Sequence, residues 1–235
     1  MKKYPEATIY FREQLKIKAA NGIYHTNINS AGNTIPINVF PGVFPPQQKF
    51  QLGEYLKNYP DIQNIEVADI GTGSGIEAIS AALLGAMHVD AIDISPLALE
   101  CAKQNARINN VTEKLSLFLS DLFFNIPDYK KYGLILANLP FVDFDGENNS
   151  IDLALYDNNF NTHKKFLAQS ERHLADNGRI LLPHANLQSG KTESPNADFD
   201  VLETIILDAG YKLRILDEKP FRAEYRWRLY ELRSN

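Results

Sequence analysis

A glycine-rich turn directly after a short apolar strand is the feature that most constrains how this chain can fold. Residues 67–75 read VADIGTGSG, so Gly71, Gly73 and Gly75 stand between a predicted strand and an alanine-rich helix predicted over 75–84. Glycines in such a turn let the backbone approach a ligand closely, because no side chain intervenes. The turn therefore predicts a ligand site where the first strand ends.

From residue 65 onward, short β-like runs alternate with helical patterns, as a parallel sheet with crossover helices requires. We therefore expect the α/β class: a doubly wound, mostly parallel, seven-stranded Rossmann-like sheet whose last strand is antiparallel. Ser95 is the predicted N-cap of a helix that opens at Pro96. The predicted strands are 65–70, 89–92, 115–119, 134–137, 179–182, 211–216 and 225–232. The other predicted segments are helices over 96–109, 160–175 and up to Gly210, and a mobile surface loop over 189–200.

Residues 1–64 lack the alternation of strand-like and helical patterns seen in the rest of the chain. Prolines at 36, 41, 45 and 46 interrupt them, so we expect a helix and an extended arm folded over the main domain. The arm is an accessory and not an independent domain. We expect residues 65–235 to form the main domain, since 235 residues suffice for one full core.

Composition excludes several classes of protein. The first twenty residues contain no apolar signal region, and charges recur too often for a membrane span, so we expect a cytoplasmic protein. The single cysteine, Cys101, excludes an internal disulfide and is expected to be a buried structural thiol. The five histidines show no metal-ligand spacing, so we expect no metal site. A net charge of −5 argues against a surface devoted to nucleic acid, although residues 211–235 carry seven cationic and four acidic side chains.

The residues around the glycine turn favour S-adenosylmethionine (SAM) over a dinucleotide. Dinucleotide enzymes place their third glycine one residue later, where this chain has Ile76. SAM has no pyrophosphate, and its ammonium group benefits from an acid, a role that Asp69 could fill directly or through water. Cofactor binding is therefore assigned to Asp69 and to the glycines at 71, 73 and 75.

Two further acids follow the next two predicted strands. Asp93 ends the second strand, where a carboxylate can accept hydrogen bonds from both ribose hydroxyls. Its alternative role is a carboxylate that interacts with the N-terminus of the following helix. Asp121 follows the third strand and could accept from the adenine amino group, while Leu122 packs on the ring.

The fourth strand ends in Asn138-Leu139-Pro140-Phe141, where open α/β sheets bind ligands. A planar NH2 nitrogen is a poor nucleophile because its lone pair is delocalised. The Asn138 side-chain oxygen and the Leu139 carbonyl could accept its two hydrogens and aim the lone pair at a methyl carbon. Pro140 would fix the loop, and Phe141 would stack on a planar group.

These residues together carry a family resemblance. The stretch from Val67 to Phe141 resembles the protein (glutamine-N5) methyltransferases that act on release factors, within the group that shares an Asn-Pro-Pro-Tyr/Phe motif with adenine-N6 methyltransferases. The matching text is DIGTGSG at 69–75, DISP at 93–96, AL at 98–99, Ala102, NA at 105–106, DLF at 121–123 and NLPF at 138–141. The resemblance implies that Asp93 binds ribose, Asp121 neighbours adenine, and Asn138 with the Leu139 carbonyl holds the acceptor.

The sequence departs from that family in three places. Leu139 stands where the family has proline, which is closer to the Asn-Leu/Ile-Pro-Tyr form of rRNA dimethyladenosine methyltransferases. Residues 41–48 resemble the family's extended segment but lack its arginine and acidic residues, and the arm is shorter than its helical recognition domain. Three functions stay open: methylation of a glutamine amide or a small amide or amine metabolite, methylation of adenine in RNA or DNA, and a SAM-binding subunit that activates a partner.

Overall fold

The computed structural model describes residues 8–9, 12–13, 15–17, 21–47, 52–57, 62–147, 149–187, 196–222 and 225–235. Seven strands form one sheet in the order β5-β4-β3-β6-β7-β9-β8, and β1 and β2 form a separate hairpin. The strands are β1 Tyr24–Ser30, β2 Asn33–Val39, β3 Glu66–Ile70, β4 His88–Asp93, β5 Leu115–Leu119, β6 Tyr132–Ala137, β7 Leu174–Asn186, β8 Tyr211–Arg222 and β9 Tyr225–Ser234. The helices are α2 Leu52–Leu56, α3 Ile76–Leu83, α4 Pro96–Ile108, α5 Ser150–Leu155, α6 Asn161–Ser170 and α7 Ala197–Asp208.

The predicted fold class is confirmed. β3 pairs in parallel with β4 and β6, β4 with β5, and β6 with β7, whereas β9 runs antiparallel to both β7 and β8. The chain starts the sheet at β3, continues outward through β4 and β5, and then returns to the other side of β3 with β6. This reversal between β3 and β6 is the switch point at which doubly wound sheets bind ligands.

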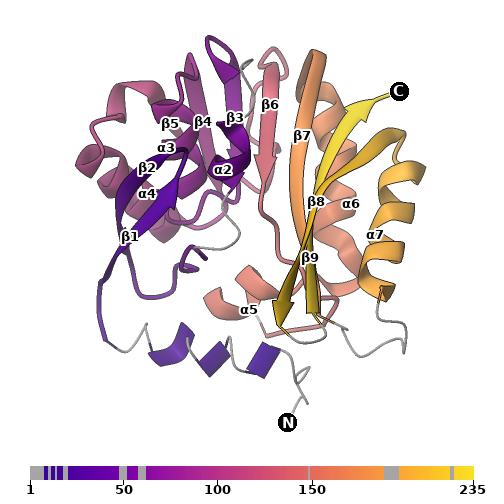
Figure 1. Ribbon diagram of the computed structural model, residues 1–235, viewed down its shortest axis with the longest axis horizontal. Coiled ribbons are helices and arrows are strands. Elements are labelled where there is room, and N and C mark those ends of the chain that lie inside the picture. Colours follow the sequence, from indigo (N-terminus) through magenta and orange to yellow (C-terminus); the bar gives the residue numbers. More distant parts are fainter. Residues whose placement is uncertain are drawn as a thin grey trace.

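The central strands are buried on both faces because helices cover each side of the sheet. Val67 and Leu134 face the cluster that includes α3 and α4, whereas Ala68 and Ile135 face the cluster that includes α6 and α7. Figure 1 shows α3 and α4 beside the β4–β5 end and α6 and α7 beside the β7–β9 end. Among the described residues, no helix is long and apolar enough to cross a membrane.

The region before β3 is partly more regular than the predicted extended arm. Its β1–β2 hairpin packs on α4, where the Asn105 side chain accepts from the Asn38 backbone N–H and donates to the Asn38 carbonyl, both at 2.8 Å. The buried Cys101 thiol donates to the same carbonyl, in agreement with the structural role predicted for it. The N-terminal segment, here residues 8–17 where described, includes helical residues and lies near α5 (Figure 1).

Several boundaries differ from the sequence prediction, among them the end of β8, which runs to Arg222 where the prediction ended at 216. The helix predicted over 160–175 ends at Ser170 and is followed by a 3-10 turn over Glu171–His173. The His173 ring is buried, stacks on Phe123 with the ring centroids 4.6 Å apart, and donates from its Nδ1 to the Lys130 carbonyl. The strand predicted over 179–182 is the much longer β7. The loop predicted over 189–200 is partly helix, since α7 starts at 197, while 189–195 lie outside the described residues.

Candidate functional site

Strand register brings the predicted site residues to one edge of the sheet. Ile70, the last residue of β3, lies opposite Ile92 of β4 and opposite Ala137 of β6. The next residue along each of these strands is Gly71, Asp93 or Asn138. The glycine turn, the ribose candidate and the acceptor motif therefore start side by side at the carboxyl edge.

The glycine turn closes tightly against its neighbours. Gly71, Gly73 and Gly75 all have positive φ angles, of 71°, 53° and 82°, which glycine adopts at little cost. A Cβ at Gly75 would lie 2.9 Å from the Cβ of Ala102, so the turn and α4 could not approach this closely. A Cβ at Gly71 would lie 3.8 Å from the backbone oxygen of Asn138. The turn is thus in near contact with the acceptor motif.

Asp69 is buried and binds the turn itself. Its Oδ2 accepts from the Thr72 hydroxyl at 2.6 Å and from the Ala78 backbone N–H at 3.1 Å, and its residue is 1% exposed. Burial raises the pKa of this carboxyl to about 6, although both hydrogen bonds act in the opposite direction. The structure therefore gives Asp69 a role in holding the turn, and its contact with a ligand ammonium stays a prediction.

Asp93 is half-buried, with one oxygen directed to each neighbouring turn. Its Oδ2 accepts from the Gly73 backbone N–H and its Oδ1 from the Ser95 backbone N–H, each at 2.9 Å. The second bond realises the alternative role at the N-terminus of α4, where Ser95 also caps the Ala98 N–H as predicted. Because each carboxylate oxygen has two lone pairs, Asp93 keeps capacity to accept from a ligand.

Asp121 and Leu122 follow β5 at the same edge but differ in exposure. The Asp121 side chain is 52% exposed and lies 3.9 Å from the Lys165 ammonium. Leu122 packs into the core on the α6 side and is 7% exposed, which leaves little of its surface for an adenine ring. Ile94, which directly follows Asp93, is 62% exposed at this edge. Sequence reasoning missed this candidate apolar wall, although an isoleucine next to a ribose candidate was a usable signal.

The acceptor motif combines an exposed amide with a buried anchor. Asn138 is exposed, whereas Leu139 is 4% exposed and packs in the same core cluster as Ile135. Phe141 is half-buried against the opposite cluster. The departure from proline at position 139 thus has a packing explanation, since the leucine side chain fills the core.

Two positioning groups lay outside the sequence prediction of the site. Glu77, 5% exposed on α3, accepts from the backbone N–H groups of Leu52 and Gly53, which start α2. Burial, together with the nearby Asp69 carboxylate, raises the pKa of Glu77 to about 8. Asn105 donates to the Ser74 carbonyl and so joins the hairpin to the glycine turn. Only tertiary packing gives these side chains their partners, so no local pattern identified them.

A buried polar cluster lies behind the acceptor motif. Asp157 accepts from the backbone N–H groups of Thr162 and His163 at the start of α6, and its Oδ2 lies 2.7 Å from the His163 Nδ1. Burial holds the pKa of the neighbouring His184 well below its ordinary value, and His163 acts in the same direction. Across the described ranges, no three His, Cys, Asp or Glu side chains gather in a way that could hold a metal ion.

Comparison with known sequences finds that the chain is similar to several methyltransferases. The family described as ribosomal protein L11 methyltransferase matches residues 53–140. A Methanocaldococcus jannaschii relative named for protein N5-glutamine methyltransferase activity is 39% identical over 108 residues, which cover 46% of this chain and 52% of the relative. The release factor glutamine methyltransferase of Lactococcus lactis is 34% identical over 60% of this chain and 54% of its own length. The chain thus matches about half the length of these relatives, and the predicted resemblance is confirmed.

Solved structures share the fold. The ribosomal protein L11 methylase of Lactobacillus delbrueckii superposes with a TM-score of 0.57 at 21% identity and covers 82% of both chains. The Thermus thermophilus 16S rRNA N2 G1207 methyltransferase, solved with AdoMet and guanosine, gives a TM-score of 0.63 at 16% identity over 91% of this chain and 50% of its own. At such identities the likeness concerns the fold, which is that of the SAM-dependent methyltransferases.

Proposed function

We propose that this chain, which has the fold of class I SAM-dependent methyltransferases and resembles the glutamine-N5 group, methylates a planar NH2 nitrogen with SAM as donor. The observation that carries the proposal is the contact between two turns. The glycine turn and the Asn138 turn follow register partners on adjacent strands, and Gly71 lies in near contact with the Asn138 backbone. A donor on the first turn and an acceptor on the second would therefore meet.

The described residues fit SAM. The glycine turn leaves open backbone, Asp93 retains lone pairs for the ribose hydroxyls, and Ile94 offers an exposed apolar side chain for adenine. SAM supplies a methyl group on a sulfonium that already carries the driving force. The chain mainly has to hold the two reactants close together and in line.

The acceptor clamp consists of one side chain and one backbone carbonyl. The exposed Asn138 oxygen would accept one hydrogen of the NH2 group and the Leu139 carbonyl the other, which moves the nitrogen toward sp3 geometry. As the nitrogen–carbon bond forms and the sulfur–carbon bond breaks, the nitrogen gives up one proton to water. Buried Leu139 would anchor the loop and so hold its own carbonyl in place for this role.

The favoured acceptor is a glutamine side-chain amide in a protein, or else a small amide or amine. The two relatives named for glutamine methyltransferase activity support this choice. Solved neighbours also include enzymes named for rRNA and tRNA, so adenine in a nucleic acid is the second candidate.

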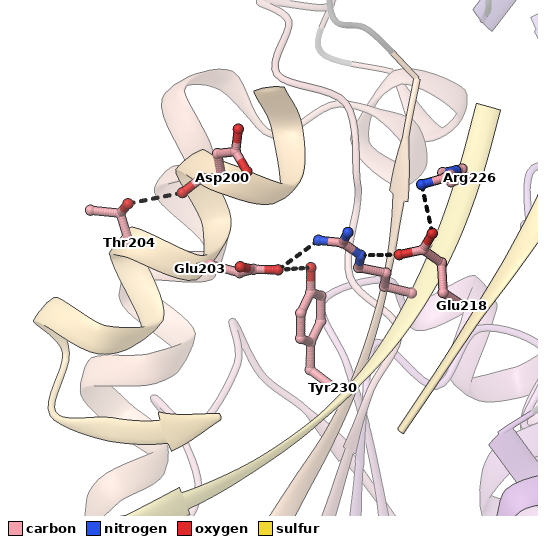
Figure 2. Close-up of polar contacts among 7 residues, drawn as sticks. Asp200, Glu203, Thr204, Glu218, Arg226 and Tyr230 are labelled. Atoms are coloured by element: carbon pink, nitrogen blue, oxygen red, sulfur yellow. Dashed lines mark hydrogen bonds and ion pairs between the residues drawn. The ribbon is translucent and has the colours of Figure 1, made fainter. Parts of the chain in front are cut away.

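The charges of the last two strands do not favour nucleic acid. Figure 2 shows Glu218 bound to Arg226 and Glu203 bound to Tyr230. Arg228 joins the two pairs, because its guanidinium lies 2.5 Å from the Glu218 carboxylate and 2.8 Å from that of Glu203. Lys219, Arg214 and Arg233 likewise lie within 4.0 Å of Asp217 or Glu231 carboxylates. The neighbouring carboxylates reduce the net positive charge that these strands offer for the phosphate neutralisation on which nucleic-acid binding depends.

The test is to incubate the purified chain with radiolabelled SAM and cell extract and then to digest the macromolecules separately with protease and with nuclease. Label that protease removes supports the glutamine acceptor, and label that only nuclease removes supports adenine. Label confined to small molecules identifies a metabolite. Asn138→Ala should abolish most of the labelling, while Asn27→Ala, at an exposed asparagine on β1, serves as the matched control. No labelling by the intact chain would contradict enzymatic activity and favour the role as a partner subunit.

A further inference from the structure

The chain that follows the acceptor motif folds back and pairs with Val142, directly after the motif. Val142, the residue after Phe141, forms a parallel bridge with Tyr156. The Val142 N–H donates to the Leu155 carbonyl at 3.0 Å, and the Asp157 N–H donates to the Val142 carbonyl at 2.8 Å. The position of the motif at its carboxyl side therefore depends on how residues 142–157, the acceptor-side loop, are held.

Asp152 organises this acceptor-side loop from within. Its residue is 1% exposed, its Oδ2 accepts from the Glu147 N–H, and its own N–H donates to the Asn149 side chain. A Cβ at Gly146 would lie 2.7 Å from the Tyr156 ring and 3.0 Å from the Asp152 Cβ, so this loop is closely packed. A carboxylate buried to this degree requires a charged partner in addition to its hydrogen bonds.

The N-terminal segment supplies that partner. Arg12 forms an ion pair with Asp152, and its guanidinium carbon lies 5.9 Å from the Tyr156 ring centroid. Four residues earlier, the Thr8 hydroxyl lies 2.8 Å from the Tyr156 hydroxyl. Both residues are buried, as is Leu15, three residues after Arg12. The spacing of 8, 12 and 15 puts these side chains on one face of a helix, directed at the acceptor-side loop.

The same face of the N-terminal segment also lies close to residues 42–43, which pack near the start of α4. Leu15 lines a small cavity with Val43, Ser150 and Ala154. A Cβ at Gly42 would lie 3.3 Å from the Ser150 hydroxyl and 3.5 Å from Leu97 at the start of α4. Figure 1 shows the N-terminal segment and α5 at the edge toward which β6 points. The segment therefore lies on the side of the sheet where the candidate site is.

We propose that Arg12 is a positioning residue for the methyl acceptor: through its ion pair with Asp152 and its contact with Tyr156, it holds the acceptor-side loop and with it the Asn138–Phe141 motif. This proposal rests on the proposed function, because it concerns how the acceptor is presented. It assigns the N-terminal segment to the acceptor half of the site. SAM, bound on the other half, does not depend on Arg12.

The first experiment needs no acceptor. Arg12→Met keeps an unbranched apolar side chain but removes the guanidinium and its charge, so the hydrogen bonds of the Val142 and Asp157 backbone N–H groups should open more often. Hydrogen exchange measured by NMR is expected to speed up about tenfold or more at these two amides, while β3 amides stay protected. Arg107→Met, at an exposed arginine on α4, is the matched control. Unchanged exchange at Val142 and Asp157 would overturn the proposal.

The second experiment uses the acceptor identified by labelling. Arg12→Met is expected to raise the acceptor KM about tenfold or more, because a misplaced loop loses alignment, while the Kd for SAM changes less than about twofold. Arg12→Lys, which keeps a charge for Asp152, should restore part of the affinity. An acceptor KM that stays at the wild-type value would overturn the proposal, as would a loss of SAM affinity equal to the loss of acceptor affinity. A wild-type chain that transfers no methyl group contradicts the proposed function instead, and hydrogen exchange then judges the Arg12 contact separately.

Discussion

Glu77 gives a prediction whose size follows from the structure. This carboxyl is 5% exposed, faces the Asp69 carboxylate and has a pKa raised from 4.5 to about 8. At neutral pH the unfolded chain has therefore lost this proton while the native chain keeps it. A raised carboxyl pKa stabilises the fold below the unfolded value of 4.5, and that stability is lost as the pH rises through about 8.

One pKa unit corresponds to about 1.4 kcal/mol. As the pH rises from 5.5 to 8.5, the raised pKa of Glu77 should therefore lower the free energy of unfolding by about 3 kcal/mol. Glu77→Gln cannot ionise and should lack this loss. The unfolding free energy of the wild type, measured with denaturant and circular dichroism, should therefore fall relative to that of the variant over this range.

The control is Glu113→Gln, which makes the same replacement at an exposed glutamate before β5. The outcome that would refute the reasoning is a Glu77→Gln profile that also runs parallel to the wild type. In that case Glu77 would be ionised in the native state at neutral pH, and its two hydrogen bonds to the start of α2 would outweigh its burial.

The remaining predictions concern the candidate site. Asp93→Ala should weaken SAM binding about tenfold to several hundredfold without unfolding the chain, because hydrogen bonds to a carboxylate are lost; unchanged affinity by calorimetric titration would remove Asp93 from the site. Asn138→Ala should lower kcat about a hundredfold to a thousandfold with little change in SAM affinity, because its contact strengthens in the transition state. Wild-type turnover by this variant would argue against the NH2 clamp and for oxygen or carbon acceptors. Phe141→Ala should raise the acceptor KM through lost stacking as well as slow turnover. Acceptor binding should depend only weakly on salt, and a steep dependence would favour nucleic acid.

The sequence by itself determined which residues end the central strands. The glycine turn, Asp93 and the Asn138 motif each follow a short apolar run, and local patterns of this kind predict strands and the turns after them. Because parallel strands place their carboxyl ends at one edge, the class of fold and the position of the site followed from those patterns. The resemblance to glutamine methyltransferases rests on the same local sequence motifs.

Only the tertiary structure decided what the side chains do at that edge. The Asp69 carboxylate accepts hydrogen bonds from Thr72 and Ala78. The Leu139 side chain packs in the core, and the Glu77 carboxyl accepts from the backbone at the start of α2. Each of these outcomes depends on burial or on a partner that packing brings into reach, which composition and spacing do not encode.

The contact between Arg12 and Asp152 joins residues that are far apart in sequence, as does the contact between Asn105 and Asn38. Local propensities predicted a helix and an extended arm before residue 65 but could not give them a docking surface. Which face of the arm meets which loop is set by the burial of charged and apolar side chains across the whole fold. For that reason the sequence located the candidate site, and the three-dimensional packing determined the residues that hold it in place.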